Sequence, residues 1–512
     1  MINYKKYYEV IKDFVQTHPL LIIFFFSFFL YITCGLYMSF YNDIIIKTRY
    51  DIAYSLDTGI RYYQLYAQTP CETAAHPYTN TLFPFIAIIK SMVYSTRFSM
   101  ILCQSLIASS SCCLFFTALK NLNIQKHICI IFTGIFGISF SQLLTTTLPE
   151  IYVFSGFTQV LFLFYIINIT KQKTTTLSLS QIFILATLTT LSFGINLVNI
   201  ILSLITLIYL LLCVYKTNFK NLFITFFKIA LISIFLITGL AQIQKLAHHE
   251  KTFFTPLKQG LHNKEKHPSA RFMTNLPHKE RIPYLVNGTF IQPFYAMKSS
   301  PSKTKKVIYG YKKIIPKQNI HYWIFADNQN IARQIPFLLF LFMPIFIILR
   351  SSKKFIKFKS SQIIYLLLPL ILTNSVCNYF FDVKNSFLFS QNNLCYLVLL
   401  IALLYSNVPK KITVPACLAF LAYQIPINFY TLHKIQKFIS QTATEHHSVG
   451  TWILWALIVC ICFGVIGFAN TKLIKKEVLE LPTEKKYLLY TSLYLGYTII
   501  YEIFIILFQG RA

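Results

Sequence analysis

Ionisable side chains gather soon after the first long apolar run of the sequence, at 19–40. Asp51, Asp57 and Arg61 lie in RYDIAYSLDTGIRYYQLY, and His76 follows, just before a proline. A carboxylate next to a membrane span can act as a general base on a hydroxyl or an amine, or can ligate a divalent metal. Asp57 could instead cap a helix that begins near SLDTG.

Two further candidates stand at the edges of apolar runs. Glu150 lies in TTTLPEIYVF, where an acid between apolar segments needs water or a partner close by. It could also be a first-turn acid that complements a helix dipole. Arg97 precedes the run 98–118 and could grip a phosphate through two hydrogen bonds, or simply extend its charge toward the membrane surface.

Asn199, in FGINLVNII, adds a polar candidate between two apolar runs. Such an amide can hydrogen-bond between helices or line a cavity. The histidines and cysteines have no spacing typical of zinc sites, and Walker A, Gly-rich dinucleotide and HExxH motifs are absent from the sequence. We therefore expect no nucleotide cofactor, while a divalent metal held by the acidic residues is an open possibility.

The composition indicates which elements must position these side chains. The 512 residues are 55% hydrophobic and 12% charged, whereas a soluble domain carries about 25% charged residues. A helix needs about 20 apolar residues to cross a bilayer, and strictly alternating strand patterns are absent. We therefore predict an all-α polytopic integral membrane protein with about thirteen spans, from the apolar runs 19–40, 98–118, 127–147, 150–170, 181–195, 196–215, 221–244, 335–350, 361–381, 391–406, 412–430, 450–470 and 487–508.

Lysine placement predicts the orientation of these spans. Lysines and arginines cluster in alternate connections, most strongly between Arg350 and Lys359, which predicts an inside N-terminus and an outside C-terminus. Two outer loops follow, 41–97 and 245–334, and 78–95 within the first reads as an interfacial helix. The chain then divides into a module at 1–244, the large loop at 245–334 and the C-terminal spans at 335–512.

The charge balance indicates the kind of partner. The net charge is +30, and the large loop alone has 16 Lys/Arg against 4 Asp/Glu. Because most of the chain faces lipid, we expect no nucleic acid partner; the basic surfaces suit anionic membrane lipids and phosphate groups. The twelve cysteines lie mostly in apolar segments and imply no disulfide framework.

Taken together, these features resemble the GT-C superfamily of membrane glycosyltransferases, nearest to protein O-mannosyltransferases and to transferases that move aminoarabinose onto lipid A. In those families an acid stands in the first outer loop, followed by an entry into an interfacial helix, an arginine at span two, a second acid after span three and a large outer loop after span seven. The matching positions here are Asp57, His76-Pro77, Arg97, Glu150 and the loop 245–334.

The resemblance implies a GT-C-like architecture and transfer of a sugar from a polyprenyl-phosphate-linked donor to a lipid, glycan or protein acceptor. Asp57 or Asp51 would be the general base or organise a metal, and Glu150 would be the second acid of the site. Arg97, Arg61, His76 and Asn199 would bind substrate or phosphate. The implied location is a bacterial inner membrane, with the site facing the periplasm.

Three other functions compete with this one. A transporter or flippase for lipid-linked glycans would show ionisable residues deep in spans and internal repeats, and few of the former and none of the latter are visible. A glycan polymerase or ligase would lack the acids after span one. A non-catalytic scaffold is the third, since Asn385 stands where sequences of the resembling families tend to carry an acid.

Overall fold

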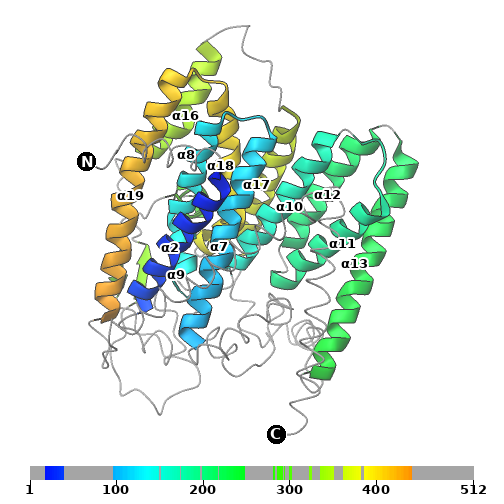
Figure 1. The fold of residues 1–512 in the computed structure, drawn as a ribbon, viewed down its shortest axis with the longest axis horizontal. Coiled ribbons are helices and arrows are strands. Elements are labelled where there is room, and N and C mark those ends of the chain that lie inside the picture. The colour runs from blue at the N-terminus through cyan, green and yellow to red at the C-terminus, as the bar shows by residue number, and fades with distance from the viewer. Residues whose placement is uncertain are drawn as a thin grey trace, which may run out of the picture.

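The fold was analysed in a computed structural model of the chain. It describes residues 18–39, 96–148, 152–172, 174–196, 199–216, 218–247, 281–282, 285–291, 293–294, 299–302, 322–325, 335–350, 361–381 and 386–440. These residues form a helical bundle with one short pair of strands (Figure 1). The predicted runs 450–470 and 487–508 and the predicted interfacial helix 78–95 lie outside these ranges.

Every predicted apolar run within the described ranges is helical. The helices are α2 (Pro19–Ser39), α7 (Thr96–Asn121), α8 (Lys126–Ile138), α9 (Phe140–Thr147), α10 (Tyr152–Gln172), α11 (Leu179–Ile195), α12 (Asn199–Tyr215), α13 (Phe219–Ala247), α16 (Ile335–Arg350), α17 (Ser361–Phe381), α18 (Ser386–Ser406) and α19 (Lys410–Ser440), with a π-helical turn η2 (Asn287–Ile291). Strands β1 (Ser299–Ser302) and β2 (Tyr322–Phe325) pair antiparallel, with Ser299 opposite Phe325.

Helix length and composition identify the chain as a helical membrane protein. Among the described helices, 6 are long and apolar enough to cross a membrane, or up to 7 if the bent pair α8–α9 is one span. Four apolar helices are shorter: 179–195, 199–215, 335–350 and 391–406. The total of about thirteen spans and their orientation therefore remain predictions.

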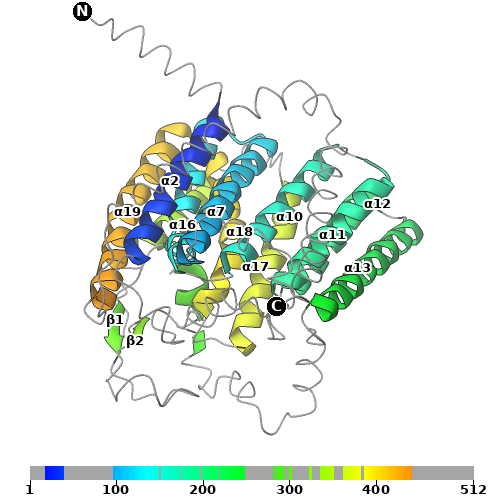
Figure 2. The same cartoon turned by 60° about the horizontal axis from the view of Figure 1, so that its bottom comes forward.

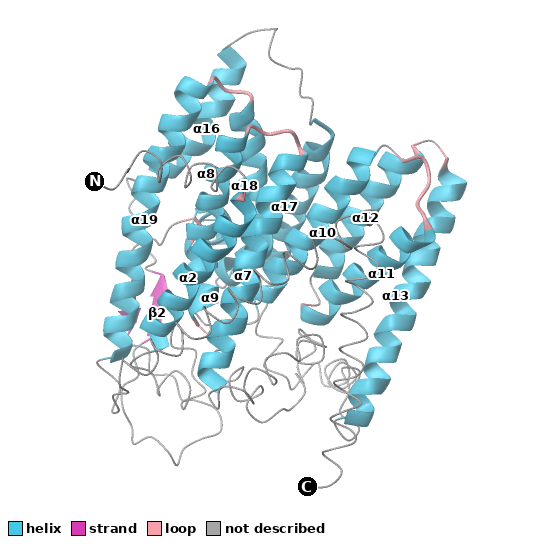
Figure 3. Cartoon of the chain, in the orientation of Figure 1, coloured by secondary structure: helices cyan, strands magenta, loops and turns pink. Residues whose placement is uncertain are grey.

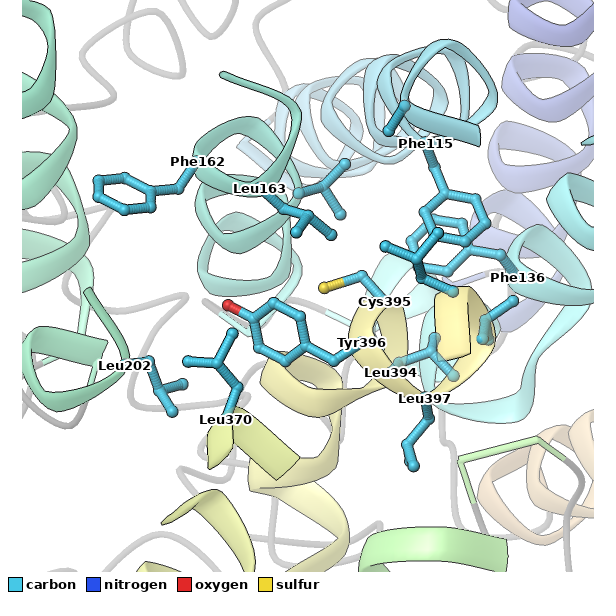
Figure 4. Close-up of a cluster of buried hydrophobic side chains, with 14 of the residues drawn as sticks. Phe115, Phe136, Phe162, Leu163, Leu202, Leu370, Leu394, Cys395, Tyr396 and Leu397 are labelled. Atoms are coloured by element: carbon cyan, nitrogen blue, oxygen red, sulfur yellow. The ribbon is translucent and has the colours of Figure 1, made fainter. Parts of the chain in front are cut away.

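Helix α18 lies at the centre of the bundle. Its residues from Gln391 to Leu399 are buried on every side, the pattern of a helix surrounded by others. Figure 4 shows Tyr396 of α18 directed between Leu163 of α10 and Leu370 of α17. A central helix with no exposed face must satisfy its polar side chains through its neighbours, which bears on the site described below.

Helix α13 lies at the edge of the bundle. Its outward face carries exposed aromatic side chains, Phe223, Phe227 and Phe235, which are 68%, 64% and 77% exposed. In a membrane protein, such a face is suited to contact lipid. Lys228 lies on the same helix and is also exposed.

The helices run alternately up and down through the bundle, so their connections collect at two ends (Figures 1 and 3). One end, here called the lysine end, holds the short loops after α7, α10, α12 and α18. There Asn121 Nδ2 donates to Asn168 Oδ1 at 2.5 Å, and Leu177 N donates to Tyr215 Oη at 3.3 Å. Lysines in or beside these loops are Lys120, Lys126, Lys171, Lys216, Lys220, Lys410 and Lys411.

The opposite end, here called the Leu148 end, is where α2, α9, α11, α13 and α17 finish and where α7, α10, α12 and α18 begin. Tyr37 and His433 meet there, with Tyr37 Oη 2.6 Å from His433 Nδ1. The β1–β2 pair lies near the finish of α19 at this end (Figure 2). The lysine-rich loops are thus separated from the Leu148 end by the length of the bundle (Figure 1), while the side of the membrane that each end faces stays a prediction.

Candidate functional site

Most of the predicted site residues fall outside the described ranges. Asp51, Asp57, Arg61, His76 and Glu150 are among those not described. The backbone of Arg97 lies in the first turn of α7. Asn199 is fully described; it is the first residue of α12 and is completely buried.

The described bundle is polar in places, yet its interior is uncharged. No Asp or Glu occurs anywhere in the described ranges. The buried polar side chains of these ranges are Ser, Thr, Asn and Gln. Any carboxylate that acts on this bundle must therefore come from the other parts of the chain, which include the loop with Asp51 and Asp57 and the turn with Glu150.

Ser155 is the centre of a buried cluster near the Leu148 end. Its Oγ donates to Asn392 Oδ1 at 2.6 Å and accepts a hydrogen bond from Asn199 Nδ2 at 2.7 Å. One hydroxyl thus connects α10, α12 and α18. The hydrogen bond between helices, which was one of the two roles that the sequence allowed Asn199, is present.

Gln391 extends this cluster to α9. Ser141 Oγ donates to Gln391 Oε1 at 2.7 Å, and Gln391 Nε2 donates to Gln142 Oε1. Gly156 of α10 makes room for it, because a Cβ there would lie 3.0 Å from the Gln391 side chain. Tyr396, further along α18, donates to Gln159 Oε1 of α10 at 2.6 Å.

We call these eight residues the amide cluster: Ser141, Gln142, Ser155, Gln159, Asn199, Gln391, Asn392 and Tyr396. Several of its buried polar atoms have no hydrogen-bond partner among the described residues: Gln142 Nε2, Gln159 Nε2, Asn199 Oδ1 and Asn392 Nδ2. Amides of this kind can bind hydroxyl groups or water by both donating and accepting. A charged group in the same place would be surrounded by uncharged side chains, because the buried polar residues of the described ranges are Ser, Thr, Asn and Gln, and an unpaired buried charge is costly.

Leu148, the last described residue before Glu150, is hydrogen-bonded to α7. Gln104 Nε2 on α7 donates to Leu148 O at 2.9 Å and to Thr145 O at 3.2 Å. Gln104 lies seven residues, or about 10 Å along the axis, after Arg97. Gln104, in the first half of α7, therefore joins this helix directly to the finish of α9.

Helices α8 and α9 form a bent pair that, taken together, is long and apolar enough for one broken span or a re-entrant loop. They bend by 50° at Ser139. The sequence analysis treated the apolar run 127–147 as one continuous span, although Gly137, two residues before Ser139, is of a residue type at which helices often kink. The bend turns α9 so that Ser141 and Gln142 meet α18.

The sequence interpretation missed most of the amide cluster. Gln142, Ser155 and Gln159 were not identified as candidates, and neither were Gln391 and Asn392. A usable signal was present, because Asn and Gln inside apolar runs are expected to hydrogen-bond between membrane helices. Three consecutive amides, Gln391 to Asn393, in one apolar run are the strongest instance of that signal.

Comparison with known proteins adds no relative. No protein-family model, no curated protein and no solved structure matches this chain. Within the described ranges, no group of three His, Cys, Asp or Glu side chains could hold a metal ion. A divalent metal therefore remains a prediction that depends on acidic residues outside those ranges.

Proposed function

We propose that this chain is a membrane glycosyltransferase that moves a sugar from a polyprenyl-phosphate-linked donor to a lipid, glycan or protein acceptor. The observation that carries the proposal is the convergence at the Leu148 end. Several described parts of the chain lie at this end together with the amide cluster. They are the first turn of α7, which includes Arg97, the residues Leu148 and Tyr152 on either side of Glu150, and Asn199.

The uncharged interior supports the proposal in a second way. A sugar presents hydroxyl groups that both donate and accept hydrogen bonds, and buried amides match them without bringing a charge into the membrane. Carboxylates are needed for chemistry, and in this chain they are confined to segments outside the described bundle. Recognition by amides and catalysis by acids would then be supplied by different parts of the chain.

The proposed reaction assigns one task to each residue. The bond between the sugar's anomeric carbon and the donor's phosphate oxygen breaks, and the polyprenyl phosphate leaves with the electron pair. The acceptor's oxygen or nitrogen bonds to that carbon, and its proton passes to Asp57, or to Asp51 in its place. Arg97, with Arg61, His76 and lysines of the large loop, stabilises the leaving phosphate, while Glu150 shapes the acceptor site.

Mass spectrometry of envelope glycans tests this proposal in cells. Three strains are compared: the wild type, a gene deletion, and the deletion expressing Asp57→Asn at the wild-type level. We expect one sugar-sized mass to disappear from an acceptor in both mutants. Full restoration by Asp57→Asn would exclude Asp57 and transfer its role to Asp51, and an unchanged deletion strain would contradict the proposal.

The broken span favours a second candidate, a flippase or transporter for lipid-linked glycans. Discontinuous helices beside polar side chains are a common feature of transporter binding sites. The α8–α9 break next to Ser141 and Gln142 has this character. The two candidates differ in chemistry, because a flippase leaves the sugar–phosphate bond of its substrate intact.

A further inference from the structure

Part of the large basic loop lies inside the helical bundle. Residues 285–294 are described except for 292, and Thr289, Ile291 and Phe294 are at most 1% exposed. The ring of Phe294 packs against Phe337 of α16 and Phe420 of α19, with centroids 4.9 and 6.2 Å apart. A stretch that the sequence assigns to an outer loop thus occupies the core.

The break between α8 and α9 explains why residues of the large loop are needed in the core. A helix that stops and restarts leaves backbone N–H and C=O groups without partners in the helix, and within a membrane they need others. Phe140 N donates to Phe294 O at 3.3 Å, and Ser141 N donates to Pro293 O at 3.1 Å. The start of α9 is therefore completed by carbonyls of the loop.

Two amides of α19 hold both sides of this junction. Gln424 Nε2 donates to Phe294 O at 2.6 Å and to Ile135 O at 3.3 Å. Asn428 Nδ2 donates to Phe294 O at 2.9 Å and to Ile138 O at 2.8 Å. Each amide thus bridges the loop carbonyl and a carbonyl at the finish of α8.

We propose that residues 285–294 form a re-entrant segment that completes the broken span, and that Gln424 and Asn428 fasten it there. Ser141 joins this segment to the amide cluster, because its N–H donates to Pro293 and its Oγ donates to Gln391. A movement of the large loop would therefore be transmitted to the amide cluster through Ser141. This inference concerns the place of the loop and holds whichever reaction the site performs.

The test measures how fast single cysteines react with a membrane-impermeant maleimide in the full-length protein in native membranes. Thr289→Cys is nearly isosteric and reports on the buried segment, while Ile282→Cys, 56% exposed and beside Arg281, reports on its accessible flank. The unsubstituted chain gives the background from native cysteines. We expect Thr289→Cys to react at least about tenfold more slowly than Ile282→Cys, since a buried thiol reacts only through local opening.

Removal of the fastening amides should release the segment. With Gln424→Leu and Asn428→Leu combined, we expect Thr289→Cys to react nearly as fast as Ile282→Cys. Gln436→Leu, a buried glutamine of the same helix that makes none of these bonds, should leave Thr289→Cys protected. If the double variant does not accumulate, Asn428→Leu alone is measured, with a smaller rise expected.

Two results would overturn the proposal. Equal rates for Thr289→Cys and Ile282→Cys in the otherwise unchanged protein would show that the segment is not inserted. Continued protection of Thr289→Cys in the double variant, or in Asn428→Leu if only that accumulates, would remove the amides of α19 from the fastening. Neither result depends on sugar transfer, so the failure of this proposal and that of the glycosyltransferase assignment remain distinguishable.

Discussion

Asn199 Nδ2 donates to Ser155 Oγ across 2.7 Å, which joins the first residue of α12 to the first turn of α10. The same hydroxyl donates to Asn392 on α18. A single serine therefore fixes the relative depth of three helices at the Leu148 end of the bundle. We therefore expect the stability of the fold to be sensitive to substitution of Ser155.

Ser155→Ala should destabilise the protein by about 1 kcal/mol, because it removes both hydrogen bonds and leaves Asn199 Nδ2 and Asn392 Oδ1 without a partner. Equilibrium unfolding in mixed detergent micelles measures the change. Ser109→Ala is the matched control, since among the described residues this buried serine donates to the Ser105 carbonyl of its own helix and to no other helix. Equal stabilities for the two variants would mean that the contact between helices contributes nothing.

Gly156→Ala should be harmful and Gly239→Ala harmless. A Cβ at Gly156 would lie 3.0 Å from the Gln391 side chain and 3.3 Å from its carbonyl oxygen, whereas a Cβ at Gly239 meets nothing within 4 Å. We expect the first change to cost about 1–3 kcal/mol through overpacking. The second should stabilise α13 by up to about 1 kcal/mol, the usual advantage of alanine over glycine in a helix. Thermal unfolding of the purified variants checks both, and a reversed order would contradict the packing of α10 on α18.

The sequence predicted the helices well because the requirement for a spanning helix is simple and local. An apolar run near 20 residues has few alternatives in a bilayer, so runs such as 98–118 and 361–381 became helices at nearly the predicted bounds. The break at Ser139 could not be predicted in the same way. It depends on carbonyls of residues 293 and 294, more than a hundred residues away, and on amides of α19.

The candidate site was harder to predict for a related reason. Asn199 was identified because it stands at the edge of an apolar run, where a polar side chain is easily recognised in the sequence. Ser155 and Gln142 stand within runs, and their importance comes from neighbours on α12 and α18 that only the fold brings near. The acidic candidates, Asp57 and Glu150 among them, lie outside the described ranges and stay predictions.

A disulfide should form between cysteines placed at Gly35 and Ile101. The Cβ positions of these residues are 3.5 Å apart, at the near edge of disulfide geometry, and replacing Ile101 removes the Cγ2 atom that would otherwise lie 2.6 Å away. Oxidation followed by peptide mass spectrometry identifies the bond. Gly239→Cys combined with Ile101→Cys should form none, and absence of the bond in the 35–101 pair would contradict the contact between α2 and α7.

Substitutions of Glu150 and Arg97 should lower transfer because of the charge or the hydrogen-bond geometry that each residue would supply. Glu150→Gln should lower transfer by about a hundredfold, because the proposed role of this carboxylate is to orient the acceptor. Arg97→Lys should not restore the activity lost in Arg97→Ala, because an ammonium cannot hold phosphate in two places at once. Transfer assays in membranes, with expression matched, measure both effects. Lys220→Ala, at the lysine end, is the control and should retain full activity.

Cleavage of the sugar–phosphate bond tests the proposed function most directly. The purified protein is placed in liposomes with a lipid extract of its own cell membrane, and donor lipids are followed by mass spectrometry. We predict that wild-type protein converts a polyprenyl-phosphate sugar into free polyprenyl phosphate, and that Asp57→Asn does not, or Asp51→Asn if Asp51 is the base. If the donor lipid keeps its sugar in the presence of wild-type protein, the chain is not a transferase for that lipid pool, and the flippase becomes the better assignment.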